Sequence, residues 1–168
     1  MEKCVKKAYA KINLGLDVIG RLPNGYHEVK MVMQTVGIYD VLTLEKIPVG
    51  IVVTTDNGEL PTDENNLIYK SAKLMKEKYS IQEGVRIHLE KNIPIAAGMA
   101  GGSTDAAATF IGMNELFEIG ATEEELRKLG VKVGADVPYC IMGGTALAEG
   151  IGEVLSPLPA PQDCFLLI

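Results

Sequence analysis

Apolar and polar residues alternate along residues 11–20, and this period of two predicts a half-buried β-strand. The apolar face of that strand consists of Ile12, Leu14, Leu16 and Val18. Lys11 and Asn13 lie on the opposite face, two residues apart, so the two side chains are placed to meet one ligand. A solvated surface lysine is the simpler interpretation of Lys11 taken alone.

Segments rich in Val, Ile and Thr continue the strand pattern after a turn at Pro23-Asn24-Gly25. Alternation returns in "GVRIHLEK", and glycines divide "GGTALAEGIGEVLSPL" into a hairpin. The strands predicted after the turn cover residues 27–38, 40–46, 50–55 and 84–91, and the hairpin covers residues 143–158. Short connections between successive strands favour a sheet that is antiparallel and joined by hairpins.

Helical spacing of apolar residues appears in residues 64–79, with lysines on the opposite face. A second helix follows the glycine-rich segment of residues 93–108 and ends near Phe117. A third begins after Thr122, which stands three residues before Glu125 in capping-box spacing. Strands come first and a mixture of strands and helices follows, so the predicted fold class is α+β.

Composition places the chain among ordinary globular proteins. It has 168 residues, enough for one domain with a sizeable core, with 47% hydrophobic and 23% charged residues. A net charge of −6 argues against a general nucleic-acid binder but leaves room for a local nucleotide site. Three cysteines without a CxxC pair, no apolar run of membrane-spanning length and no signal-peptide stretch favour a cytoplasmic protein.

The C-terminal residues differ from the rest of the chain. Pro157, Pro159 and Pro161 form a proline-rich linker, and the apolar run Phe165–Ile168 has strand character. An exposed apolar edge strand invites aggregation, so natural domains seldom end on one. We therefore expect residues 1–155 to form one domain, and residues 156–168 to be a linker and the first strand of a further domain.

The segment "IPIAAGMAGGSTDAAA", residues 93–108, is the strongest candidate for chemistry. Its glycines let a phosphate approach the backbone, and the start of the following helix presents unpaired N–H groups with a positive dipole end. The hydroxyls of Ser103 and Thr104 would add hydrogen bonds or reach a bound Mg²⁺. Ser103, Thr104 and Asp105 are also good N-cap residues, so a tight loop with an ordinary cap explains the segment equally well.

Other candidates are single residues with a structural alternative each. Asp136, in "GADVPYC", either caps a helix with Pro138 in its first turn or accepts a proton from a substrate hydroxyl. Tyr26 and His27 either lie in a surface loop or stack on and hydrogen-bond a base. His88 lies within an alternating strand and is expected to be structural. No metal-ligand cluster and no Ser-His-Asp or Cys-His arrangement is evident.

Taken together, these segments resemble the GHMP kinase superfamily. "PIAAGMAGGSTDAAA" is similar to the superfamily's phosphate-binding motif P-x-x-x-G-L-G-G-S-S. "KINLGLDVIGRLPNGYHEV", "GADVPYC" and "GIGE" resemble the branch that acts on a cytidine diphosphate-linked methylerythritol. The resemblance, which runs from about Lys7 to the end of the chain, implies the GHMP kinase N-terminal domain fold (ribosomal protein S5 domain 2-like). In that fold helices pack on one face of a mainly antiparallel sheet.

The resemblance also implies an activity, ATP-dependent phosphorylation of the 2-hydroxyl of the methylerythritol unit. Asp136 would be the catalytic base and Lys11 its electrostatic partner, with Asn13 holding the substrate. Tyr26 and His27 would recognise the cytosine. The ATP phosphates would lie on Pro94, Gly98, Ala100, Gly101, Gly102, Ser103 and Thr104, and the adenine near Asn66 and Leu67. Mg²⁺ would arrive with ATP, and no protein ligand is assigned to it.

Met99 and Ala100 depart from the superfamily pattern, which favours Leu and Gly there, and we expect Ala100 to avoid a positive φ. Two alternatives to this activity stay open. One is a GHMP kinase of the homoserine or mevalonate type, and the other is a truncated, non-catalytic nucleotide-binding module. For any of these kinases the expected partner is a small-molecule substrate, and neither nucleic acid nor a membrane is involved.

Overall fold

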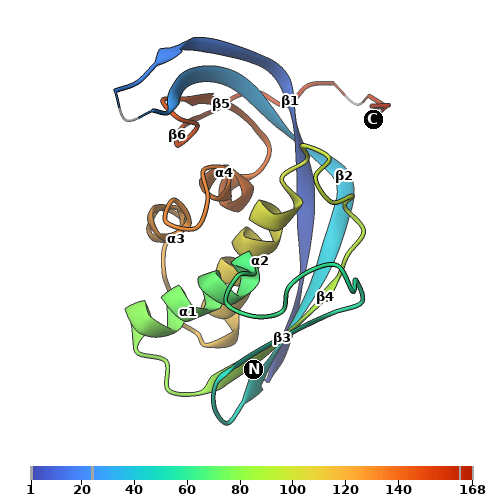
Figure 1. Ribbon diagram of the computed structural model, residues 1–168, viewed down its shortest axis with the longest axis vertical. Coiled ribbons are helices and arrows are strands. Elements are labelled where there is room, and N and C mark those ends of the chain that lie inside the picture. The colour runs from blue at the N-terminus through green and yellow to red at the C-terminus, as the bar shows by residue number, and fades with distance from the viewer. Residues whose placement is uncertain (1, 24, 163, 168) are drawn as a thin grey trace.

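One long strand, β2 (His27–Ile47), organises the sheet of the computed structural model, which describes residues 2–23, 25–162 and 164–167 (Figure 1). β1 (Lys3–Arg21) pairs antiparallel with β2 along almost its whole length. The other edge of β2 is shared between β4 (Gly84–Glu90), which pairs with residues 41–47, and β5 (Thr145–Glu149), which pairs with residues 31–34. β3 (Ile51–Thr55) lies parallel to β4, and β6 (Val154–Pro157) lies antiparallel to β5.

Sharing one edge leaves the middle of β2 without a strand partner on that side. Two chain segments enter this interval. The backbone N–H groups of Asn92 and Ile93, just after β4, donate to the Asp40 carboxylate at 2.6 and 2.7 Å. The N–H of Thr35 donates to the carbonyl of Gly144, just before β5, at 3.0 Å. The segment that leaves β4 and the segment that enters β5 therefore both bind to the middle of β2.

Four helices of the described residues cover one face of the sheet: α1 (Leu67–Tyr79), α2 (Gly101–Leu116), α3 (Glu123–Gly130) and α4 (Val137–Met142) (Figure 1). α2 lies against β1 and β2, with α1 and α4 packed beside it. α2 lies close to the sheet at Gly112, where a Cβ would lie 2.8 Å from Leu44 Cδ1 and would force that side chain to shift. Small residues along α2 thus let the helix sit deep against the strands.

The predicted helices and the α+β class are confirmed. α1 and α2 occupy the expected segments, and Thr122 and Glu125 form the reciprocal capping box that begins α3. In β4 the alternating residues Val85, Ile87 and Leu89 are buried in the main core, as their spacing predicted. The 143–158 hairpin is confirmed as β5 and β6.

The expected break between residues 38 and 40 is wrong, because β2 runs unbroken from residue 27 to residue 47. Continuous pairing with β1 on one edge holds this segment extended even where the other edge has no strand. The sheet is mainly antiparallel, as expected, although β3 and β4 are parallel. At the predicted turn, Gly25 has a φ of +87° and donates to Leu22, while Asn24 lies outside the described residues.

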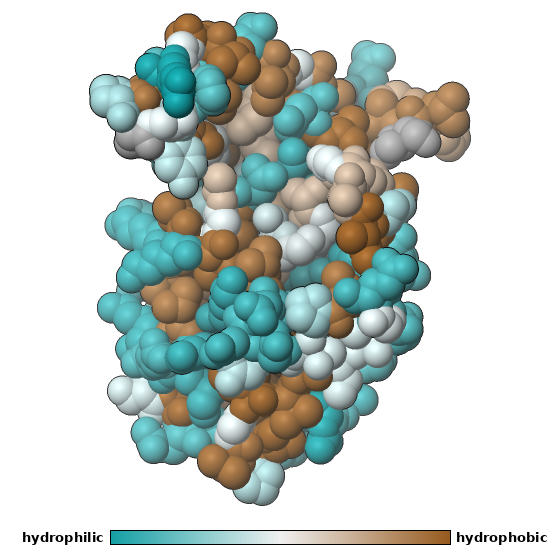
Figure 2. Space-filling view, in the orientation of Figure 1, coloured by the Kyte–Doolittle hydropathy of each residue, from teal (hydrophilic) through white to brown (hydrophobic). Residues whose placement is uncertain are grey.

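The half-buried face predicted for residues 11–20 is also wrong. Leu14, Leu16 and Val18 are 50%, 51% and 58% exposed, because the β1–β2 hairpin continues past the helices that cover the rest of the sheet (Figure 1). Brown, apolar surface is visible at this end of the molecule in Figure 2. Register shifts between Tyr9 and Lys11 and again beyond Asn13 change which side chains face the core.

The C-terminal residues differ from the expectation in two ways. Ser156 and Pro157, assigned to a linker, belong to β6, because β5 offers them a partner. Residues 164–167, expected to be strand, have no regular secondary structure, and Ile168 lies outside the described residues. The division into a domain of residues 1–155 and a further domain stays a prediction. No helix among the described residues is long and apolar enough to span a membrane.

Candidate functional site

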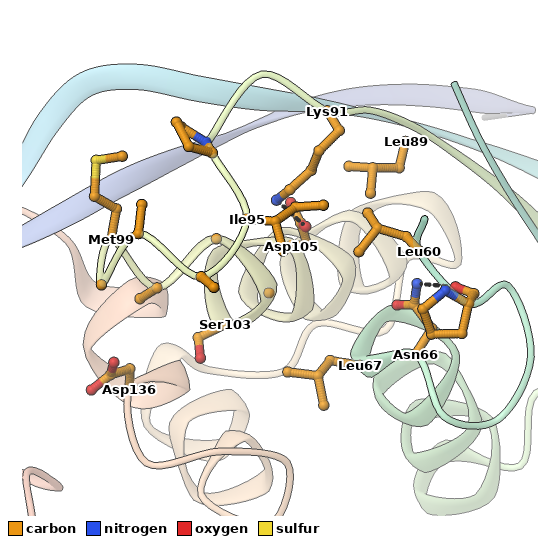
Figure 3. A pocket seen from close by; sticks show the side chains of 18 of the residues that line it. Leu60, Asn66, Leu67, Leu89, Lys91, Ile95, Met99, Ser103, Asp105 and Asp136 are labelled. Carbon is orange, nitrogen blue, oxygen red and sulfur yellow. Dashed lines mark hydrogen bonds and ion pairs between the residues drawn. The ribbon is translucent and has the colours of Figure 1, made fainter. Parts of the chain in front are cut away.

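A cavity of about 500 Å³ opens between the glycine-rich segment and the start of α1 (Figure 3). One wall consists of residues 94–103, which are part of the loop from β4 to α2 and the first three residues of α2. The opposite wall comes from the segment before α1 and from the first residue of that helix. The remaining lining residues are Leu60, Pro61, Asn65, Asn66, Leu67, Leu89, Lys91, Asp105 and Asp136. The cavity thus combines an apolar end with a backbone-rich end.

The loop delivers the chain to the start of α2 through several left-handed residues. Ala96, Gly98 and Ala100 have φ values of 59°, 73° and 57°. The expectation that Ala100 avoids a positive φ is therefore wrong: Ala100 is the N-cap of α2, and helix geometry starts at Gly101. Ser103, Thr104 and Asp105 consequently lie within the helix and are not its cap.

The first turn of α2 faces the cavity. Gly101, Gly102 and Ser103 all line it, and a helix leaves the N–H groups of its first turn without helical partners. A Cβ on Gly102 would have only an ordinary contact, 3.4 Å from Leu67 Cδ1. Thr104 behaves differently, because it is buried and its hydroxyl donates to the Gly101 carbonyl at 2.8 Å. The structure thus leaves Thr104 out of the cavity lining.

Lys11, Asn13 and Asp136 come together beside the loop. Lys11 Nζ lies 3.6 Å from Asp136 Oδ2 and donates to Asn13 Oδ1 at 3.2 Å. The Lys11 side chain is 7% exposed and that of Asp136 32% exposed, so the surface-lysine interpretation is wrong. The Lys11 N–H also donates to the Met99 carbonyl at 3.2 Å, which ties β1 to the loop.

Asp136 stands at the N-cap position of α4 but makes no side-chain capping hydrogen bond. Its carboxylate lines the cavity and is paired with Lys11. The alternative role of this residue, as an ordinary helix cap, therefore has no support in the structure. A partly exposed carboxylate beside a buried ammonium is an arrangement that can accept a proton from a bound hydroxyl.

Asn66 and Leu67 lie at the far end of the same cavity. The Asn66 side chain caps α1 by accepting from the Ile68 N–H at 2.8 Å, and it donates to the Pro61 carbonyl at 2.6 Å. Its amide group is thus occupied in shaping this wall. Leu60 and Leu89, which the sequence did not single out, supply more apolar surface there.

Three further charged residues were missed at the sequence level: Asp40, Lys91 and Asp105. Lys91 and Asp105 line the cavity, and Asp40 lies buried behind them. Burial raises the pKa of Asp105 to about 7, against the opposing effect of Lys91 and with an added increase from Asp40. A lone carboxylate in an alanine-rich helix was the available sequence signal, because a buried charge needs a partner.

Tyr26 and His27 lie at the tip of the β1–β2 hairpin. Both are exposed, and neither lines the cavity. His88 is structural, as predicted, because its Nδ1 lies 2.8 Å from Thr54 Oγ1 on the neighbouring strand. Within the part of the chain that the structure describes, no group of three or more His, Cys, Asp or Glu side chains could hold a metal ion.

Comparison with known proteins gives consistent matches. Residues 66–144 match the family model of the GHMP kinases N terminal domain. The chain is 58% identical over 163 residues to a 4-diphosphocytidyl-2-C-methyl-D-erythritol kinase of Lachnoclostridium phytofermentans, covering 96% of this chain and 56% of the relative. The chain thus spans little more than half of the length of that relative.

Solved structures show the same fold. A crystal structure of 4-(cytidine 5'-diphospho)-2C-methyl-D-erythritol kinase aligns with a TM-score of 0.82 and 37% identity, covering 94% of this chain and 56% of that one. Homoserine kinase from Cytophaga hutchinsonii aligns with a TM-score of 0.77 at 22% identity, covering 96% and 53%, which shows the fold alone. The sheet, the loop before α2 and these matches together show that the chain has the fold of the GHMP kinase N-terminal domain, with residues 66–144 matching the model of that domain family.

Proposed function

We propose that the protein carrying this chain transfers the γ-phosphoryl group of ATP to the 2-hydroxyl of 4-diphosphocytidyl-2-C-methyl-D-erythritol, in the non-mevalonate isoprenoid pathway. The observation that carries the proposal is the Lys11–Asp136 ion pair beside the first turn of α2. It puts a carboxylate and an ammonium next to a loop suited to phosphates. The 58% identical relative supports the choice of alcohol.

ATP would lie along the cavity with its adenine toward Leu60, Asn66 and Leu67 and its phosphates on the loop. Pro94, Gly98, Ala100 and the first turn of α2 would surround the phosphates with backbone groups. The phosphates would then accept hydrogen bonds from N–H groups at the positive end of the helix dipole. Ser103 would add a hydroxyl, whereas Thr104, whose hydroxyl is bonded to Gly101, would support the turn from behind.

In the chemical step Asp136 would take the proton of the substrate 2-hydroxyl. The hydroxyl oxygen forms a bond to the γ-phosphorus while the bond from that phosphorus to the β–γ bridging oxygen breaks. ADP leaves, and the proton stays on Asp136. Lys11 would balance negative charge that gathers on the transferring group, which is the main contribution a protein makes to this reaction besides positioning.

Mg²⁺ would enter as the counterion of ATP, since it keeps most of its waters and usually binds through phosphates and one or two carboxylates. The Ser103 hydroxyl, at the phosphate end of the cavity, fits such an ion. When bound, it would neutralise charge on the β- and γ-phosphates.

The substrate would approach from the hairpin side. Asn13, held by Lys11, would contact the methylerythritol unit. Tyr26 and His27 at the hairpin tip would stack on and hydrogen-bond the cytosine. A kinase of this small soluble substrate would work in the cytoplasm.

The decisive experiment is phosphoryl transfer from ATP to three separate alcohols, namely 4-diphosphocytidyl-2-C-methyl-D-erythritol, homoserine and mevalonate. We expect transfer to the first and its loss in Asp136→Asn, because a neutral amide cannot accept the proton. Glu77→Gln is the matched control, since Glu77 is an exposed residue on α1 away from the cavity.

Three outcomes would contradict the proposal in different ways. Transfer only to homoserine or only to mevalonate would assign the chain to another GHMP kinase. Binding of a non-hydrolysable ATP analogue in a calorimeter, with turnover on none of the alcohols, would support a nucleotide-binding module without catalysis. Equal turnover in wild type and Asp136→Asn would remove Asp136 from the role of base.

A further inference from the structure

Three buried charged side chains meet directly beneath the loop that crosses from β4 to α2. Lys91 Nζ lies 2.5 Å from Asp40 Oδ2 and 3.0 Å from Asp105 Oδ2. The three side chains are between 0 and 5% exposed. They come from three elements: Asp40 from β2, Lys91 from the residue after β4, and Asp105 from α2. Figure 3 shows Lys91 reaching across the base of the loop toward Asp105.

This cluster connects the two ends of the loop of residues 92–100. At the entry, the other oxygen of Asp40 accepts the N–H groups of Asn92 and Ile93. At the exit, the Lys91 ammonium lies so close to Gly101 that a Cβ there would be 2.8 Å from Nζ. A single cation thereby contacts β2, the start of α2 and a carboxylate one turn into that helix.

Apart from Met99, whose carbonyl accepts the Lys11 N–H, the loop itself has little other support. All residues from Pro94 to Gly98 are exposed, and three loop residues hold a positive φ. Left-handed backbone at Ala96 and Ala100 is strained, so the loop would relax without an external constraint. Met99, packed with Ala10, Val36 and Ile93, provides a second anchor.

The cluster is also unbalanced in charge, with one cation against two carboxylates. Asp105 Oδ1 has no hydrogen-bond partner among the described residues. The titratable groups that face Asp105 are Lys91, Asp40 and the half-buried thiol of Cys140 on α4. With both carboxylates ionised, the floor of a phosphate-binding cavity carries net negative charge, which repels the anion it should hold.

We propose that Lys91, Asp40 and Asp105 form a clamp that holds the loop of residues 92–100 in the shape required for the ATP phosphates. Within this clamp Asp105 is a positioning residue that takes up a proton when nucleotide binds. The role in nucleotide binding rests on the kinase function proposed above. The role in loop shape is a property of the chain without nucleotide.

The loop part is tested by amide hydrogen exchange of the nucleotide-free chain. Lys91→Met should speed exchange of the loop amides at least about tenfold, because opening the clamp releases both ends. Asp105→Ala should have a similar effect, because it removes the carboxylate that ties Lys91 to α2, and it covers the case in which Lys91→Met does not fold. Glu115→Ala is the matched control, since it removes an exposed carboxylate from the other end of α2, away from the loop. Unchanged loop exchange in Asp105→Ala would overturn the clamp.

The proton part is tested by calorimetry with a non-hydrolysable ATP analogue between pH 6 and pH 8. Wild type should lose several-fold more affinity than Asp105→Asn over this range, because the neutral amide has no proton to take up. Comparing the two proteins cancels the titration of the analogue itself. Identical pH profiles would overturn the role of Asp105. If wild type binds no nucleotide, the kinase proposal fails, and the exchange experiment still decides the clamp.

Discussion

Replacing Ala100 by glycine should stabilise the chain, although it shortens a side chain at the edge of the core. Ala100 holds φ 57° and ψ 31° as the N-cap of α2. A residue with a Cβ pays a steric cost in this region because its Cβ approaches the carbonyl oxygen. Glycine at the same position has no such contact, and it is also a better N-cap than alanine.

The magnitude follows from two opposing contributions. The left-handed conformation costs a non-glycine residue about 1–2 kcal/mol, whereas the extra freedom of glycine in the unfolded chain costs about 0.4–1 kcal/mol. Ala100→Gly should therefore raise the free energy of unfolding by about 0.5–1 kcal/mol. Ala96→Gly, at φ 59° in the same loop, should behave in the same way.

The assay is urea unfolding followed by far-ultraviolet circular dichroism, with the midpoint compared at unchanged slope. Ala97→Gly is the matched control, because Ala97 is exposed in the same loop and is not among the residues with positive φ. This control should lose about 0.5–1 kcal/mol. If Ala100→Gly lowers the midpoint as Ala97→Gly does, the backbone at residue 100 carries no strain and the reasoning fails.

Three further predictions concern stability and binding. Asp105→Asn should remove a pH dependence of stability. The pKa of Asp105 rises from 3.8 to about 7 on folding, so between these pH values the folded chain binds more protons than the unfolded chain. The free energy of unfolding of wild type should therefore fall by up to about 4 kcal/mol from about pH 4 to about pH 7. Urea midpoints that fall equally in the two proteins would contradict this. Gly102→Ala should raise the urea midpoint, because alanine favours helix more than glycine does. It should also weaken binding of an ATP analogue at least about tenfold, because the added Cβ blocks the approach of a phosphate to the backbone. Unchanged affinity in calorimetry would count against phosphate binding at Gly102. Thr122→Ala should lower the free energy of unfolding by about 1 kcal/mol through loss of the capping box with Glu125, and a thermal scan showing no change would refute it.

Local patterns were enough to predict most elements of the fold. The period of two in β4, the helical spacing of α1 and the capping box at Thr122 each depend on residues a few positions apart. The glycine-rich segment could be located and assigned to a helix start for the same reason. The backbone conformation of this segment could not be predicted, because the surrounding structure enforces the left-handed φ of Ala100 against the preference of the residue.

Burial was the property that local patterns predicted least well. Leu14, Leu16 and Val18 alternate as a core-facing strand should, yet they are exposed because no helix covers that end of β1. Lys11, on the face expected to be polar and solvated, is buried against the loop and Asp136. Whether a strand face is covered depends on elements distant in sequence, so alternation alone shows only that two faces differ.

The sequence by itself determined most of the strands and helices, where the glycine-rich loop lies, and which residue types were available for chemistry. Only the tertiary structure decided that Lys11 meets Asp136, and that Lys91 joins Asp40 and Asp105 beneath the loop. These pairs join residues 14 to 125 positions apart, and they form because β4 and β5 share one edge of β2 and bring their loops to the middle of the sheet. Contacts at that separation are set by sheet topology, which no local period of apolar residues encodes.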